Sequence, residues 1–267
     1  MWSTEQEEIP TEFFLGGRDL EMEAIRALLD RCSSGRIHDK GLSWGARTSD
    51  YAAEIEACLA AGRRAVLVEL VDDRGFEQRE GVIVVDHHGS RSGSDRPTSL
   101  EQIFELIGRP RSEWTRELAL VAANDRGHVR AMKAMGASVE EMQRVRAADR
   151  AAQGISPDEE REGEAAAHQR RELLHGRLTV VDLPHARTAT VGDVLDADLG
   201  GPGYTNLVIL SPTSTTVFGE GSVIDALRTR WPEGWYGGDL PQRGYWGVGR
   251  RLDEVKVVEV VQCTLER

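Results

Sequence analysis

The chain reads Val82-Ile83-Val84-Val85-Asp86-His87-His88-Gly89 at the end of its first third. A run of β-branched residues of this kind is typical of a buried strand in a parallel sheet. In open α/β sheets, ligands bind at the carboxyl ends of the strands. Asp86, His87 and His88 are therefore expected at a functional edge, and carboxylate and imidazole groups can both bind a metal or move protons.

Strand and helix patterns alternate on either side of this stretch. Strands are predicted at residues 11–17, 43–47, 65–71 and 82–85, and helices at 19–32, 50–61, 99–107 and 113–123. This order favours an α/β fold, with an N-terminal parallel sheet flanked by helices.

The composition shifts to Ala, Glu, Arg and Gln after residue 138, which predicts a helical connector. Strands recur at residues 178–183, 205–210, 215–218 and 255–261, with a helix at 222–230. We therefore expect an N-terminal domain at 1–137, a helical connector at 138–176, and a smaller C-terminal α/β domain at 177–267.

Composition limits the class of protein. The 267 residues are 40% hydrophobic and 29% charged, which is ordinary for a globular protein. No stretch approaches the ~20 apolar residues of a membrane span, the start is acidic, and the three cysteines are widely spaced, so a cytoplasmic location is expected. The net charge of −12 argues against general duplex binding, but it leaves room for a short nucleotide in a local pocket.

Acidic residues also stand where other predicted elements begin or end. Asp19 and Glu21 follow a glycine turn, Asp72 and Asp73 follow a strand, and Asp125 ends an apolar helix. Each has a structural alternative, as a helix cap, a turn residue or a solvated acid. Together with imidazole and no thiolate, they favour Mn²⁺ or Mg²⁺, and two metals would offset their mutual repulsion.

These motifs resemble those of the DHH phosphoesterase superfamily, which includes RecJ-type exonucleases, nano-RNases, cyclic-dinucleotide phosphodiesterases and family II pyrophosphatases. Asp86-His87-His88 matches the motif that names the group. Asp19-Leu20-Glu21, Asp72 and Asp125 match its first, second and fourth motifs in order. The resemblance covers the N-terminal half; the C-terminal half is more weakly similar to the family's substrate-binding domain.

The resemblance implies a two-metal site and a role for each of its residues. Asp72 would bridge the metals, Asp19 would bind one, and Glu21, His87 and Asp125 the other. Asp86 would orient a histidine or complete a metal shell. His88 would face the phosphate and stabilise charge or protonate the leaving oxygen, with a metal-bound hydroxide as the nucleophile.

Two departures from the family pattern bear on the metals. Glu21 replaces the usual second aspartate of the first motif, and Leu15 stands where many members have a histidine. One of the two metal sites is therefore expected to be weaker, rearranged or empty.

Substrate contacts are predicted in both halves. His128 and Arg91 lie near the motifs, although a solvated helix histidine and a solvated loop arginine are the structural alternatives. The glycine-rich and aromatic segment at 234–249 suits close approach to a phosphate and stacking on a base. Its candidate residues are Gly237, Gly238, Arg243, Tyr245 and Trp246, and a hairpin with core aromatics is the alternative.

Three functions remain open at this point. The first is a Mn²⁺- or Mg²⁺-dependent phosphodiesterase acting on short oligonucleotides or on linear or cyclic dinucleotides. The second is a pyrophosphatase or another small phosphoanhydride hydrolase. The third is a catalytically degenerate domain that binds a nucleotide or a protein, which Leu15 and Glu21 favour. The oligomeric state, including a homodimer, is also open.

Overall fold

The structure is a computed structural model that describes residues 9–32, 34–88, 91 and 96–266. It divides into two compact units, Met1–Ala137 with Ala147–Gln153, and Ser138–Arg146 with Gly154–Arg267. The acidic start and Gly89 lie outside the described residues, as does most of the loop predicted after Gly89.

A four-stranded parallel sheet organises the first unit, as predicted. Its strands are β1 (Thr11–Leu15), β2 (Arg36–His38), β3 (Arg64–Val68) and β4 (Val82–Val85), in the spatial order β2-β1-β3-β4. The strand predicted at 43–47 is wrong: the second strand is β2. Leu42 and Arg47 make only single bridges, to Gly17 and Val71.

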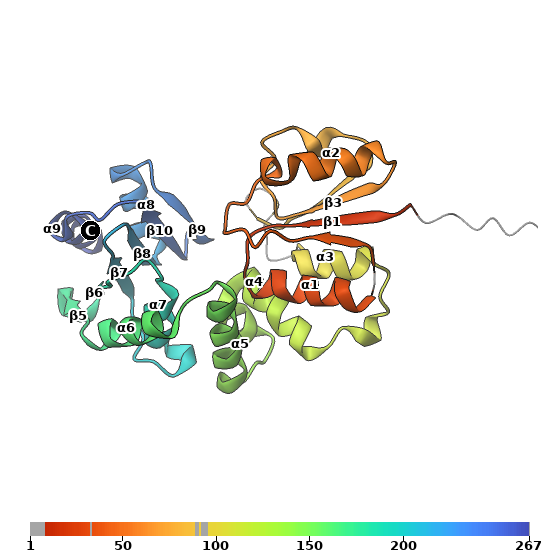
Figure 1. The fold of residues 1–267 in the computed structure, drawn as a ribbon. Coiled ribbons are helices and arrows are strands. Elements are labelled where there is room, and N and C mark those ends of the chain that lie inside the picture. The colour runs from red at the N-terminus through yellow and green to blue at the C-terminus, as the bar shows by residue number, and fades with distance from the viewer. Residues whose placement is uncertain (1–8, 33, 89–90, 92–95, 267) are drawn as a thin grey trace, which may run out of the picture. The chain divides into compact units, whose positions relative to one another are not determined.

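Helices cover both faces of this sheet (Figure 1). Three of them pack on one face, namely α1 (Leu20–Cys32), α3 (Ser99–Leu106) and α4 (Arg116–Ala134). The opposite face is covered by α2 (Ala52–Ala60), whose Ile55 packs with Phe14 of β1. Burial on both faces explains why these strands are continuous hydrophobic runs.

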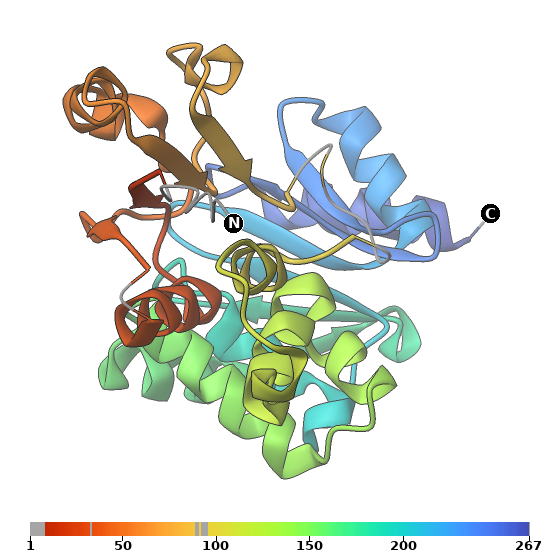
Figure 2. The same cartoon turned by 90° about the vertical axis from the view of Figure 1, so that its right-hand side faces the viewer.

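The second unit contains a mixed six-stranded sheet between helices (Figures 1 and 2). Its strands are β5 (Arg171–Leu173), β6 (Leu178–Asp182), β7 (Asn206–Leu210), β8 (Thr215–Glu220), β10 (Arg243–Val248) and β9 (Trp235–Asp239), in spatial order. On one face lie α8 (Gly221–Arg230) and α9 (Glu254–Leu265), and on the other α6 (Pro157–His168) and α7 (Ala189–Leu195). Helix α5 (Val139–Ala152) is divided between the two units.

The strand predicted at 255–261 is wrong, because this segment lies within helix α9. The side chain of Asp253 caps the helix by accepting a hydrogen bond from Val255 N at 2.9 Å. Val257 and Val261, four residues apart, are fully buried in the core of the second unit. Helical packing of these two valines outweighs the β propensity of the run.

The predicted fold class is therefore confirmed, while the predicted domain boundaries stay predictions. None of the helices in the described part of the chain combines the length and the apolar character needed to cross a membrane.

Candidate metal centre

The candidate residues gather at the edge of the first sheet where β3 and β4 end. Val68 pairs with Val85, so Glu69 and Asp86 emerge side by side, and Glu69 N donates to Val85 O at 2.9 Å. Glu69 has φ 52°, a left-handed conformation that is strained for a side chain with a Cβ and is found at functional sites. Gly16 at the end of β1 permits this close packing, since a Cβ there would lie 2.5 Å from Glu69 O.

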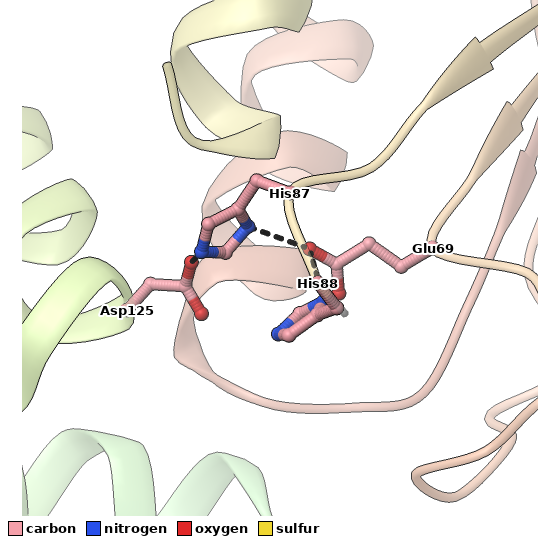
Figure 3. Close-up of side chains that lie close together, drawn as sticks. All are labelled: Glu69, His87, His88 and Asp125. Carbon is pink, nitrogen blue, oxygen red and sulfur yellow. Dashed lines mark ion pairs between the residues drawn. The ribbon is translucent and has the colours of Figure 1, made fainter. Parts of the chain in front are cut away.

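Four side chains converge at this edge: Glu69, His87, His88 and Asp125 (Figure 3). Each offers one ligand atom, and these atoms lie within 4.8 Å of one another. His87 lies between two acids, with Nε2 at 2.7 Å from Asp125 Oδ2 and Nδ1 at 3.7 Å from Glu69 Oε1. His88 Nδ1 is 3.6 Å from the same Glu69 oxygen. We call this set the metal-ligand group.

The charges of the group are strongly coupled. Burial alone would lower the pKa of His87, but its contacts with Asp125 and Glu69 outweigh burial and raise this pKa to about 10. The pKa of His88 is raised chiefly by its contact with Asp86, against the effect of burial. Burial would raise the pKa of Asp86, yet its contacts with the His88 side chain and backbone N–H lower it.

The carboxylates of Asp19 and Glu21 interact electrostatically with Glu69 and Asp125 of the metal-ligand group. The pKa of Asp19 is raised to about 7 by burial and by the charges of Glu69 and Asp125. The pKa of Glu21 is raised well above its usual value by burial and by the same two carboxylates. Asp19 Oδ1 also accepts from Met22 N at 2.8 Å, as a helix cap does, and Glu21 Oε1 accepts from Leu100 N at 2.9 Å.

The donor atoms fit a divalent cation. Glu69 Oε1, His87 Nδ1, Asp125 Oδ2 and Glu21 Oε2 are buried without a hydrogen bond of normal geometry to any described residue. Buried polar atoms without partners are rare and costly, and among the described residues three of them belong to the metal-ligand group, although others lie elsewhere. Carboxylate oxygens with imidazole nitrogen and no thiolate suit Mn²⁺ or Mg²⁺.

Asp72, predicted to bridge the metals, has a different role in the structure. Its oxygens accept from the backbone N–H groups of Arg74, Phe76 and Glu77 at 3.1, 3.1 and 2.9 Å. They also accept from Thr48 Oγ1 at 2.9 Å. Burial would raise the pKa of Asp72, but these hydrogen bonds lower it. Asp72 therefore fixes a turn, and Glu69, not Asp72, lies in the metal-ligand group.

Replacing Asp72 by Ala is expected to lower the free energy of unfolding by about 1–3 kcal/mol, because several donors lose their acceptor. Affinity for Mn²⁺ should stay at the wild-type value. Urea unfolding and calorimetric titration with Mn²⁺ measure the two effects, and a large loss of metal affinity would place Asp72 in the centre after all.

The other candidates of the first unit are placed around this group. Asp86 and His88 contact each other, with Oδ1 and Nδ1 3.4 Å apart. Arg91 Nη2 pairs with Glu77 at 2.9 Å, and its Nη1 lies 3.4 Å from Asp86 Oδ2. His128 is exposed and has φ 51°, at a break in the helical backbone of α4.

The candidates of the second unit lie on the hairpin of β9 and β10. Tyr245 is partly exposed and lies over Gly237, where a Cβ would be 2.4 Å from its hydroxyl. Gly238 has φ 101°, which favours glycine, and Arg243 Nη1 donates to Thr205 O at 2.9 Å. Trp246 is fully buried in the core, so its ring cannot stack on a substrate in this conformation.

Glu69 was not among the site residues predicted from the sequence. A signal was present, because Glu69 directly follows a buried strand just as Asp86 does. The family motif has an aspartate at this place, which favours Asp72 over the glutamate three residues before it.

No protein-family model matches this sequence, and the comparison with curated proteins finds no match. Among solved structures, the manganese-bound exonuclease RecJ has a TM-score of 0.50 at 15% identity, over 95% of this chain and 89% of that one. An exopolyphosphatase-related protein from Bacteroides fragilis has a TM-score of 0.53 at 9% identity, over 98% of this chain and 93% of the other. The resemblance inferred from the motifs is thus confirmed at the level of the fold.

Proposed function

We propose that this chain, whose fold is that of the DHH phosphoesterases, is a metal-dependent phosphodiesterase of short oligonucleotides or of linear or cyclic dinucleotides. One observation carries the proposal: ligand atoms of Glu69, His87, His88 and Asp125 lie within 4.8 Å of one another at the carboxyl ends of parallel strands. Two of these atoms, Glu69 Oε1 and His87 Nδ1, are buried with no hydrogen-bond partner among the described residues. The fold shared with a manganese-bound exonuclease supports the same chemistry.

The acids and His87 would bind the cations. Glu69, His87 and Asp125 would hold one divalent cation, and Asp19 and Glu21 would contribute to a second. A bound cation supplies Lewis acidity, which polarises a phosphate and activates water for attack.

His88, although it belongs to the metal-ligand group, would act as the acid of the reaction and not as a metal ligand. It is half exposed, and its Nδ1 faces Asp86 and Glu69. Its Nε2 is therefore the nitrogen that can donate a proton to the leaving oxygen.

The second unit offers a surface for bases. Trp235 and Tyr245 are both partly exposed, and each ring lies over a glycine of the neighbouring strand, Gly247 and Gly237. Cross-strand pairing places both rings on the face of the hairpin opposite Trp246. Aromatic rings of this kind stack bases without selecting their sequence.

The test is release of mononucleotide from a panel of linear and cyclic dinucleotides with Mn²⁺. We expect turnover that EDTA abolishes and that added Mn²⁺ restores. Metal binding without turnover of any phosphodiester or phosphoanhydride would contradict the proposal and favour a degenerate binding domain.

A phosphoanhydride hydrolase is the second candidate, because the fold is also similar to that of an exopolyphosphatase-related protein. Phosphate release from pyrophosphate and from short polyphosphate separates the two functions. Faster turnover of these substrates than of any dinucleotide would favour the second candidate.

A further inference from the structure

An exposed tryptophan lies in a loop at the carboxyl edge of the first sheet. The side chain of Trp44 is 88% exposed, the largest exposed fraction among the large hydrophobic residues described. Val71, in the loop after β3, is 52% exposed. Single exposed apolar residues are ordinary on protein surfaces, but Trp44 and Val71 lie in neighbouring loops at the same edge of the sheet.

Backbone contacts place Trp44 beside the first acidic motif. A Cβ on Gly17 would lie 2.8 Å from Trp44 N, and Arg18 N donates to Leu42 O at 2.8 Å. Asp19 follows Gly17 by two residues, which span at most about 7 Å. A Cβ on the preceding Gly16 would lie 2.5 Å from Glu69 O, so two adjacent glycines after β1 contact the backbone of Trp44 on one side and that of Glu69 on the other.

Val71 is held against the same loop. Its N–H donates to Ala46 O at 2.9 Å, and Thr48 N donates to Val71 O at 3.0 Å. Val71 follows Glu69 of the metal-ligand group by two residues. The loops after β2 and β3 therefore bring two exposed apolar side chains to the edge that carries the metal ligands.

Two cations accompany these apolar residues. Arg18 pairs with exposed Glu23 at 3.2 Å, and Arg47 lies 4.0 Å from Asp73. Both guanidinium groups are more than half exposed, and exposed ion pairs of this kind contribute little stability. Both are therefore available to a phosphate, in a chain whose net charge is −12.

We propose that Trp44 stacks on a nucleobase of the substrate whose phosphate lies at the metal-ligand group. The proposal rests on the proposed function and narrows it, because a substrate that uses Trp44 carries a base and is not a bare polyphosphate. Stacking a base on an exposed indole ring removes apolar surface from water and is therefore favourable in free energy. This stacking does not depend on which base is present.

The experiment measures binding and needs no turnover. Adenosine 5′-monophosphate and ribose 5-phosphate, which differ by the base, are titrated calorimetrically into the wild type, W44A, W44F and V255A in the presence of Mn²⁺. Val255 is an exposed hydrophobic residue of α9 and serves as the matched control. We expect W44A to weaken binding of the nucleotide about 5- to 140-fold, to leave ribose 5-phosphate unchanged, and W44F to recover part of the loss.

Three outcomes would overturn the stacking role of Trp44: wild-type affinity of W44A for the nucleotide, an equal loss for ribose 5-phosphate, or no preference of the wild type for the compound with the base. Retained binding of ribose 5-phosphate by W44A shows that the variant is folded. A different result would contradict the proposed function alone: nucleotide binding that depends on Trp44, with no hydrolysis of any phosphate ester.

Discussion

Replacing Glu69 by Gln is expected to lower the affinity for Mn²⁺ by at least about 100-fold and to remove the proposed phosphoesterase activity with it. Changes to residues that merely support metal ligands already cost about 10- to 100-fold, and loss of a charged ligand should cost more. Glu69 is the acid that contacts both His87 and His88. Calorimetric titration with Mn²⁺ and a dinucleotide assay at saturating metal measure the two effects.

D72A is the matched control for E69Q, because Asp72 was predicted as a metal ligand, whereas Glu69 is the acid after β3 that lies in the metal-ligand group. We expect D72A to bind Mn²⁺ like the wild type, and H87A and D125N to follow E69Q. The reverse pattern, in which D72A loses the metal and E69Q retains it, would show that the loop after β3 rearranges around the cation.

The difference between Asp72 and Glu69 shows what the sequence could not supply. The end of the buried strand was predicted to within a few residues, and that uncertainty spans both acids. Only the register of β3 against β4, which pairs Val68 with Val85, identifies the acid that lies beside Asp86. The turn that engages Asp72 depends on Thr48, 24 residues away in the sequence, and such a contact is invisible in a local pattern.

In the rest of the fold, too, local sequence patterns predicted some elements, while others depend on tertiary packing. The parallel sheet and its covering helices were predictable, because strands buried on both faces are continuous apolar runs. Helix α9 was not, since its valines favour a strand locally and only the core of the second unit selects the helix. For Trp246 and Tyr245 the sequence left stacking on a base and packing in a core both open, and the structure buries Trp246 while Tyr245 beside it is exposed.

The metal-free protein is expected to lose stability as the pH rises from 5 to 8.5. The folded-state pKa of Asp19 is raised from 3.8 to about 7, so the folded protein holds this proton more tightly than the unfolded chain. The stability from Asp19 is complete below about pH 4 and is lost as the pH rises through 7. His87 acts in the same direction, with its contribution lost between about 6.5 and 10. The shift at Asp19 alone corresponds to about 4 kcal/mol at most.

A bound cation should reverse this trend, because metal ligands must lose their protons and affinity therefore rises with pH. We expect the Tm in EDTA to fall across this range, and the increase in Tm on adding Mn²⁺ to grow. D19N is the control, since its amide does not ionise and its Tm in EDTA should fall less between pH 5 and 7. Carboxylates with a lowered pKa, such as Asp72, are protonated only below this pH range. They stay charged throughout the experiment and do not mask the fall in Tm. A Tm in EDTA that rises with pH, or the same fall in D19N, would mean that Asp19 is not buried against the charges of Glu69 and Asp125.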